Sequence, residues 1–192
     1  MTDVINILEN HSALIEHGLS SLDTEQLQIA AEMIAITIKE GGKIFTIGNG
    51  ASAAIASHWA TDYTKGCANL NKKPKVRPQV ISLASNVPLI TAIGNDMGYE
   101  YIYSNQLRWL ANPDDMLITI SSSGNSPNII KALEVANSMN LDTIALTGFS
   151  GGKCKEMAIV NLHVDVHEYE ATEDCHQAIM HIIAKHLRKV LW

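Results

Sequence analysis

Residues 121–126, with the sequence SSSGNS, place five small hydrogen-bonding side chains and one glycine in succession. They follow a short apolar run at 116–120 and precede Pro127, where an apolar-periodic helix begins with Ser126 in the N-cap position. Backbone N–H groups, the positive end of a helix dipole and hydroxyl donors therefore meet at one place. The segment predicts a site for phosphate or another small anion, although a polar turn with a good cap has the same composition.

A second turn of this type lies at 48–52, with the sequence GNGAS, between an apolar run at 43–47 and an alanine-rich helix. It also suits close approach of the backbone to an anion. Gly48, Gly50 and Ala53 match the dinucleotide fingerprint G-x-G-x-x-A. However, the next strand ends in Ala-Ser-Asn at 84–86, with no acidic residue for a ribose, and the lysine of a P-loop is missing. Nucleotide-dependent oxidoreduction is therefore disfavoured.

Two pairs of titratable residues have helical spacing. His58 and Asp62 are separated by four residues on the helix after the first glycine turn, and Glu173 and His181 by eight on the last helix. A histidine on a helix is more often a surface or core residue than a ligand. These two helices, however, are both expected near the phosphate loop, and histidine with carboxylate suits zinc or acid–base work on a sugar.

Strands and helices must alternate to position these groups. Right-handed crossovers between the strands give a parallel sheet of about five strands, which binds ligands at the carboxyl ends of the strands. Two further helices, 3–17 and 24–40, precede the sheet, and their surplus apolar surface indicates either an oligomer interface or ordinary core packing. The predicted strands are 43–47, 79–83, 116–120, 143–147 and 160–164, and the later helices are 51–62, 87–111 (broken at 94–98), 127–139 and 171–191.

Composition limits the classes of protein. The 192 residues fit one α/β domain, and a net charge of −6 disfavours general binding of nucleic acid. No apolar stretch reaches the length of about 18 residues that a membrane span needs, and the first residues lack the basic region of a signal peptide. A cytoplasmic protein without membrane attachment is expected. Three widely spaced cysteines indicate neither a disulfide framework nor a cysteine zinc site.

Five segments, in their order and spacing, resemble the sugar isomerase (SIS) domain family, and most closely its phosphoheptose isomerase branch. They are GNGAS at 48–52, GND at 94–96, SSSGNSPN at 121–128, LTG at 146–148 and the last, histidine-bearing helix. The resemblance implies a single SIS domain over residues 1–192, with helices for oligomerisation at 1–40 and an α/β core at 41–192. The implied fold is a three-layer αβα sandwich around a five-stranded parallel sheet of flavodoxin-like topology.

The resemblance also implies which residues form the site. Catalysis would involve Asp62, His181 and Glu173, and in some members zinc, one ion per subunit, is held at the positions of His58, Asp62, Glu173 and His181. The family has glutamate at the position of Asp62 and usually glutamine at that of Glu173. The implied substrate-binding residues are Asn49, Gly50, Ser52, Asp96, Ser121, Ser122, Ser123 and Ser126.

The implied activity is aldose–ketose isomerisation of sedoheptulose 7-phosphate to D-glycero-D-manno-heptose 7-phosphate through an enediolate. Asp62 is favoured over Glu173 as the base because its position matches that of the family base. The implied assembly is a homotetramer with active sites between subunits, and the product would supply heptose for lipopolysaccharide, capsule or another glycan. The alternative is a non-catalytic SIS regulator, either a phosphosugar sensor or an adaptor that binds a replication initiator. Retained acid–base groups favour the enzyme.

Overall fold

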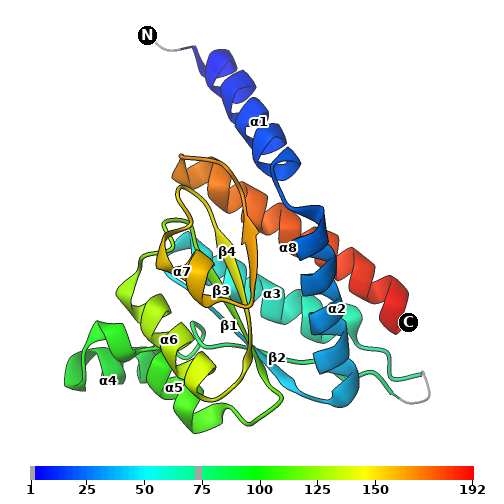
Figure 1. Ribbon diagram of the computed structural model, residues 1–192, viewed down its shortest axis with the longest axis vertical. Helices are drawn as coiled ribbons and strands as arrows, with labels where there is room; N and C mark the ends of the chain where they lie inside the picture. Colours follow the sequence, from blue (N-terminus) through cyan, green and yellow to red (C-terminus); the bar gives the residue numbers. More distant parts are fainter. Residues whose placement is uncertain (1–2, 72–74) are drawn as a thin grey trace.

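The computed structural model describes residues 3–71 and 75–192 (Figure 1). Within these residues helices and strands alternate as predicted. The strands are β1 (Lys43–Gly48), β2 (Gln79–Ser82), β3 (Met116–Ser121), β4 (Asp142–Thr147) and β5 (Val160–His163). The helices are α1 (Val4–Ser20), α2 (Thr24–Glu40), α3 (Ala51–Cys67), α4 (Val87–Asp96), the 3-10 helix η1 (Tyr99–Tyr101), α5 (Ser104–Leu110), α6 (Pro127–Ser138), α7 (Gly152–Met157) and α8 (Tyr169–Leu191).

All five strands are parallel and lie in the order β2-β1-β3-β4-β5, so the predicted flavodoxin-like sheet is confirmed. Strand β2 pairs with one edge of β1, and the next strand in the sequence, β3, pairs with the opposite edge of β1. In sheets of this kind, ligands bind where the strand order reverses. Gly48 at the end of β1 is in register with Ile120 of β3, so the turn at 48–52 and the serine segment at 121–126 leave the sheet side by side.

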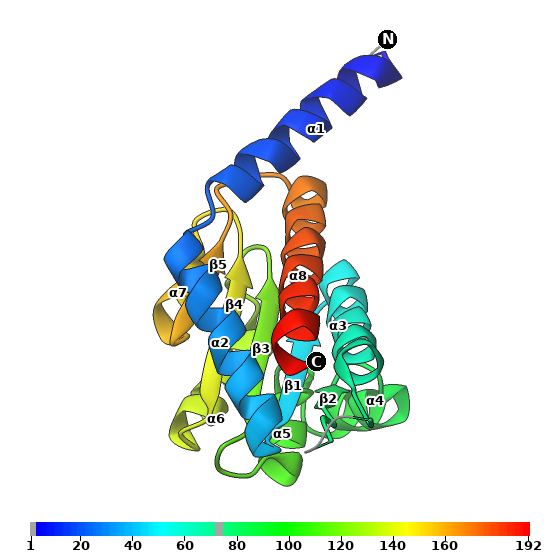
Figure 2. The same cartoon turned by 90° about the vertical axis from the view of Figure 1, so that its right-hand side faces the viewer.

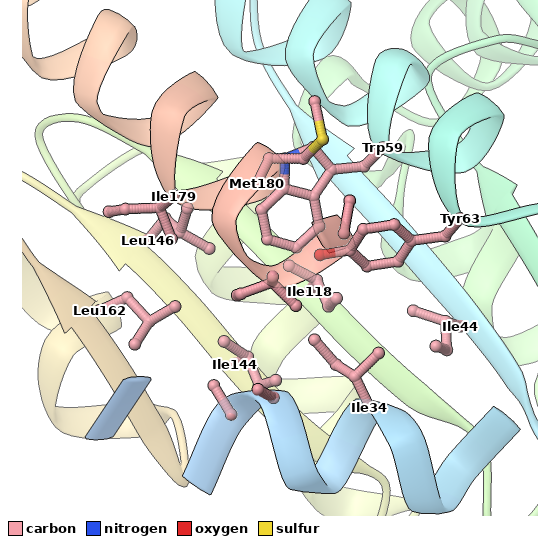
Figure 3. Close-up of a cluster of buried hydrophobic side chains, with 14 of the residues drawn as sticks. Ile34, Ile44, Trp59, Tyr63, Ile118, Ile144, Leu146, Leu162, Ile179 and Met180 are labelled. Atoms are coloured by element: carbon pink, nitrogen blue, oxygen red, sulfur yellow. The ribbon is translucent and has the colours of Figure 1, made fainter. Parts of the chain in front are cut away.

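Helices cover both faces of the sheet, which confirms the three layers (Figures 1 and 2). The core beneath α2, α3 and α8 contains Ile44 and Ile118 of the sheet. Their neighbours on the same strands, Phe45 and Leu117, point to the other face and enter the core beneath α4 to α7. Figure 3 shows the first core, in which Trp59 of α3 and Met180 of α8 are grouped with side chains of the sheet. No helix in the described residues is both long and apolar enough to cross a membrane.

The first helix, α1, extends away from the sheet and contacts the start of α8 (Figures 1 and 2). Its attachment includes His11, whose Nε2 lies 2.7 Å from Asp174 Oδ2. The end of α1 fits closely, because a Cβ on Gly18 would lie 2.7 Å from Cys175 Sγ. Farther out, Val4 is 73% and Leu8 64% exposed. The apolar surplus predicted for the two leading helices is therefore left uncovered on α1, whereas α2 buries most of its apolar side chains in the core.

Two local predictions need correction. Residues 94–96 continue α4 instead of interrupting it, and the break comes at Gly98, whose φ of 112° only glycine adopts easily. No helix is predicted between the strands 143–147 and 160–164, but Gly152–Met157 forms α7. A helix of 6 residues is shorter than two turns and has no apolar period to detect.

Buried His176 makes the fold sensitive to acid. It lies on the core side of α8, and burial lowers the pKa of its imidazole from 6.5 to about 4. Between these values the unfolded chain binds a proton that the folded chain does not, so the free energy of unfolding falls as the pH drops through this window. We expect a loss of about 2 kcal/mol between pH 7.5 and pH 4.5 from this group.

Denaturant unfolding of the wild type and of His176→Gln at both pH values measures this contribution. The loss should be smaller in His176→Gln and unchanged in His186→Gln, a matched control on the half-exposed side of the same helix. Identical pH dependence in His176→Gln and the wild type would contradict the assignment.

Candidate active site

A pocket of about 140 Å³ opens at the carboxyl edge of the sheet, where β1 and β3 end. Most of its lining is polar and comes from the two segments singled out in the sequence and from the start of α8. The lining residues are Asn49, Ser52, Ile120, Ser121, Ser122, Ser123, Ser126, Tyr169 and Glu173. Six of the eight residues predicted to bind substrate therefore surround one cavity.

Three helix N-termini meet at this pocket. Ser52 is the second residue of α3, Ser126 is the N-cap of α6, and Tyr169 is the first residue of α8. Each terminus presents unpaired N–H groups and a partial positive charge. No lysine or arginine is among the lining residues, so dipoles and hydroxyl groups supply the attraction for an anion.

Most of the serine hydroxyls are free to bind a ligand. Within the described part of the chain, Ser52, Ser121 and Ser126 make no side-chain hydrogen bond, and the buried hydroxyl of Ser122 has no partner. Ser123 is engaged, since its Oγ accepts a bond of 3.3 Å from the backbone N–H of Asn125. Ser126 occupies the predicted N-cap, but its hydroxyl does not cap the helix. A buried polar group without a partner is costly, and an anion in the pocket would satisfy these hydroxyls.

Two glycines allow the loops to approach this closely. A Cβ on Gly124, whose φ is +64°, would lie 1.9 Å from the carbonyl oxygen of Gly151 in the neighbouring loop. A Cβ on Gly48 would lie 2.5 Å from the backbone of Ser52. The Gly124 carbonyl also accepts a hydrogen bond of 3.0 Å from the N–H of Cys154. The pocket wall therefore depends on backbone contacts that a larger residue would prevent.

Asn49 connects the first loop to the second. Its side-chain amide exchanges two hydrogen bonds with that of Asn128 on α6, at 2.9 and 2.8 Å. The hydroxyl of Tyr99 donates to the Asn49 oxygen at 3.2 Å. These bonds hold the turn at 48–52 against the start of α6.

A second polar group lies between α3 and α8 and joins His58, Asp62 and His181. His58 Nε2 lies 3.5 Å from Asp62 Oδ1, and His181 Nε2 lies 3.9 Å from Asp62 Oδ2. The two imidazole rings meet edge to face, with centroids 5.2 Å apart. All three side chains are partly exposed, so a ligand can reach them. The predicted convergence of the two helices is therefore present.

The donor atoms of His58, Asp62 and His181 lie within 4.8 Å of one another, and such a group can hold a metal ion. Two imidazoles and one carboxylate are a common ligand set of catalytic zinc, which keeps a further position open. Glu173 does not belong to this group. Three of the four predicted ligands therefore fit a metal, and the fourth faces the pocket instead.

Glu173 contributes a carboxyl group to the serine pocket. Burial, together with the nearby charges of Glu170 and Asp174, raises the pKa of this group.

Two predicted substrate ligands do not line the pocket: Asp96 is exposed at the end of α4, and Gly50 is the N-cap of α3 with a φ of 54°. Gly50 shapes the turn, whereas Asp96 is not brought to the pocket within this chain.

The pocket lies at the start of α3 and α8, and the cluster lies farther along the same two helices, which pack side by side (Figure 2). From Ser52 to His58 the rise along α3 is about 9 Å, and from Glu173 to His181 the rise along α8 is about 12 Å.

Gln177 is a member of the cluster that the sequence analysis missed. Its Nε2 lies 2.9 Å from His58 Nδ1 and 3.2 Å from His181 Nε2. Gln177 is four residues from both Glu173 and His181, and this helical spacing could have predicted that it shares their face of the helix.

Comparison with known proteins gives one consistent family. The family model of the SIS domain matches residues 8–148. A phosphoheptose isomerase of Chlorobaculum parvum is 34% identical over 178 residues, covering 91% of this chain and 83% of the relative. That of Akkermansia muciniphila is 36% identical over 191 residues, covering 98% and 95%. The solved phosphoheptose isomerase of Neisseria gonorrhoeae superimposes with a TM-score of 0.86 at 30% identity, covering 97% of each chain.

The serine pocket can be tested with inorganic phosphate. Gly124→Ala should abolish phosphate binding, because the added Cβ pushes the serine segment away from the loop at 148–152. Isothermal calorimetry measures the binding, and thermal unfolding should show a lower Tm for this variant. Gly66→Ala in α3 is the matched control, since its Cβ would meet only Arg188 Nη1 at 3.8 Å. Unchanged phosphate affinity in Gly124→Ala would contradict the assigned pocket.

Proposed function

The chain belongs to the SIS domain family, within its phosphoheptose isomerase branch, and we propose that it interconverts sedoheptulose 7-phosphate and D-glycero-D-manno-heptose 7-phosphate. The reaction is an aldose–ketose isomerisation. The observation that carries the proposal is an anion pocket at the start of α3 and α8 with a histidine–carboxylate cluster farther along the same two helices.

The pocket binds the phosphate of the sugar. Hydroxyls of Ser52, Ser121, Ser122 and Ser126 donate to the phosphate oxygens, and the three helix N-termini stabilise the negative charge. This end of the substrate does not react. Its binding energy fixes the position of the carbonyl and the neighbouring carbon at the cluster.

Asp62 and His181 move the protons. Asp62 removes a proton from C1 of the ketose, and the electron pair forms the double bond of an enediolate. The same proton, or one from solvent, then returns to C2 while His181 transfers a proton between the oxygens on C1 and C2. The two groups suit this division because Asp62 Oδ2 and His181 Nε2 are 3.9 Å apart.

Glu173 remains the alternative base. Its place in the phosphate pocket supports a different role, in which the carboxyl group contacts the sugar chain or the phosphate. Asp62 is one methylene shorter than the family's glutamate, and a displacement of about 1 Å can cost on the order of a hundredfold in rate. Since Asp62 contacts both histidines, we assign it the role of base.

We also propose that the cluster holds zinc. His58, Asp62 and His181 would be its ligands, with Glu173 as a fourth ligand if its side chain turns toward them. A bound zinc ion polarises a carbonyl group as a Lewis acid.

The proposed assembly is a cytoplasmic homotetramer with active sites between subunits. The exposed apolar side chains of α1, among them Val4 and Leu8, support an interface on this helix. His11 joins α1 to α8 only a few residues from Glu173, so an interface on α1 would lie beside the pocket. The product would serve heptose synthesis for lipopolysaccharide or another glycan.

A non-catalytic regulator needs the phosphate pocket but has no use for acid–base groups beside it. The cluster of His58, Asp62 and His181 therefore favours the enzyme over a phosphosugar sensor or a replication-initiator adaptor.

A coupled assay with purified protein and sedoheptulose 7-phosphate tests the function directly. We expect turnover, and we expect dialysis against a chelator to lower it and added zinc to restore it. Turnover that chelator leaves unchanged would contradict the zinc proposal alone. Tight binding of the sugar phosphate without turnover would contradict the isomerase and support a sensor or adaptor.

Variants separate the roles within the site. Asp62→Asn should lower kcat by about a hundredfold or more, and His181→Ala by at least about tenfold, because general acid–base groups contribute on this scale. Ser123→Ala should lower turnover by at least about tenfold, because it removes the oxygen that accepts the Asn125 N–H and shapes the phosphate loop. Glu173→Gln should retain more activity than Asp62→Asn. The reverse order would make Glu173 the base, and circular dichroism checks that each variant folds.

A further inference from the structure

Tyr169, the first residue of α8, is the only aromatic residue among the described residues that line the serine pocket. Its side chain is 56% exposed, and its hydroxyl makes no hydrogen bond within the part of the chain that the structure describes. A phenol hydroxyl donates one hydrogen bond and stays neutral at ordinary pH. Tyr169 therefore has a free donor at the edge of a pocket that suits an anion.

The α8 side of the pocket has few groups that attract an anion. The serine hydroxyls come from α3 and from residues 121–126, whereas α8 contributes the side chains of Tyr169 and Glu173. These two share one face of the helix because they are four residues apart. An ionised Glu173 carboxylate repels a phosphate dianion. On this side, the Tyr169 hydroxyl is therefore the side-chain donor that does not depend on the charge of Glu173.

Phe149, in the loop at 148–152, packs against the Tyr169 ring. The two ring centroids are 4.8 Å apart and the ring planes are inclined by 51°, which is a favourable arrangement for an aromatic pair. Phe149 also meets the ring of His167 edge to face, with centroids 5.8 Å apart. Because Phe149 does not line the pocket, it can influence a ligand there only through its neighbours.

Phe149 makes these contacts from an unfavourable backbone conformation. Its φ is +51°, in the left-handed region that a residue with a bulky side chain rarely adopts. In residues 3–71 and 75–192 the other non-glycine residues with positive φ are Asp114 and Asn140, whose types tolerate this region. The N–H of Phe149 donates to the Val166 carbonyl at 2.9 Å, which holds the loop against the segment before α8. Strained residues concentrate at functional sites, and here the strained residue supports a ring of the pocket.

We propose that the Tyr169 hydroxyl donates a hydrogen bond to the phosphate group bound in the serine pocket, and that Phe149 is a positioning residue that holds the Tyr169 ring at the pocket edge. The phosphate then receives donors from α8 as well as from the serine segments. The inference rests on the phosphate-binding part of the proposed function, but it does not depend on the isomerisation.

Calorimetric titration with inorganic phosphate tests the hydroxyl. Tyr169→Phe keeps the ring and removes only the donor, so the Kd for phosphate should rise by about tenfold or more, the scale of a hydrogen bond to a charged group. Tyr101→Phe is the matched control, because Tyr101 lies against Lys131 on η1 and does not line the serine pocket. Its Kd should equal that of the wild type. Equal affinity in Tyr169→Phe and the wild type would overturn the role of the hydroxyl.

A double-mutant cycle tests whether Phe149 acts through Tyr169. Phe149→Leu removes the ring but remains apolar, and it should raise the Kd for phosphate by about threefold or more. In the Tyr169→Phe background the same change should have almost no effect, because the hydroxyl that it positions is absent. Phe149→Tyr keeps the ring and should bind phosphate like the wild type. Equal fold-changes in both backgrounds would show a general effect on the loop and overturn the positioning role. Thermal unfolding checks that each variant folds.

A crystal structure of the wild-type protein with phosphate gives a direct measurement. The Tyr169 Oη should lie within about 3 Å of a phosphate oxygen, and a phenol beyond hydrogen-bond distance would overturn the proposal.

These outcomes are distinct from those of the proposed function. Phosphate binding that depends on Tyr169, in a protein that does not turn over sedoheptulose 7-phosphate, would uphold this inference and overturn the isomerase. Turnover together with unchanged phosphate affinity in Tyr169→Phe would do the reverse.

Discussion

The parallel pairing of β1 with β3 is the constraint on which the site depends. Because Gly48 is in register with Ile120, two loops and two helix N-termini must leave the sheet at adjacent points. Space there is so limited that Gly48 and Gly124 are in contact with neighbouring backbone. Helix α3 then runs from the pocket along α8, and this path brings His58 and Asp62, about two and three turns from the start of α3, to His181 of α8.

The sequence predicted what depends on local patterns and missed what depends on tertiary contacts. Five apolar runs that alternate with helices predicted all five strands to within one residue at each end. The order of the strands came from the family resemblance, since spacing alone does not determine which strands pair. Helix α7 was missed because its 6 residues have no detectable period and are held by packing against β4 and α6.

The same distinction applies within the site. His58 and Asp62 are one turn apart on one helix, so their proximity could be predicted from spacing. On α8, Glu173, Gln177 and His181 share one face, and spacing cannot tell which of them meets α3. The crossing of the two helices decides this, and it places Gln177 beside His58 and Glu173 in the pocket. The roles of these residues remain predictions.

The two carboxyl groups differ in their surroundings, and this difference bears on the choice of base. The pKa of Glu173 is already raised by burial and by two acidic neighbours, and a phosphate dianion in the same pocket would raise it further. Asp62 lies nearly three turns of α3 beyond Ser52 at the phosphate end, beside two imidazoles. A higher pKa makes the Glu173 carboxylate a poorer match for a free anionic base beside phosphate, and this direction supports the proposal that Asp62 takes the role of base.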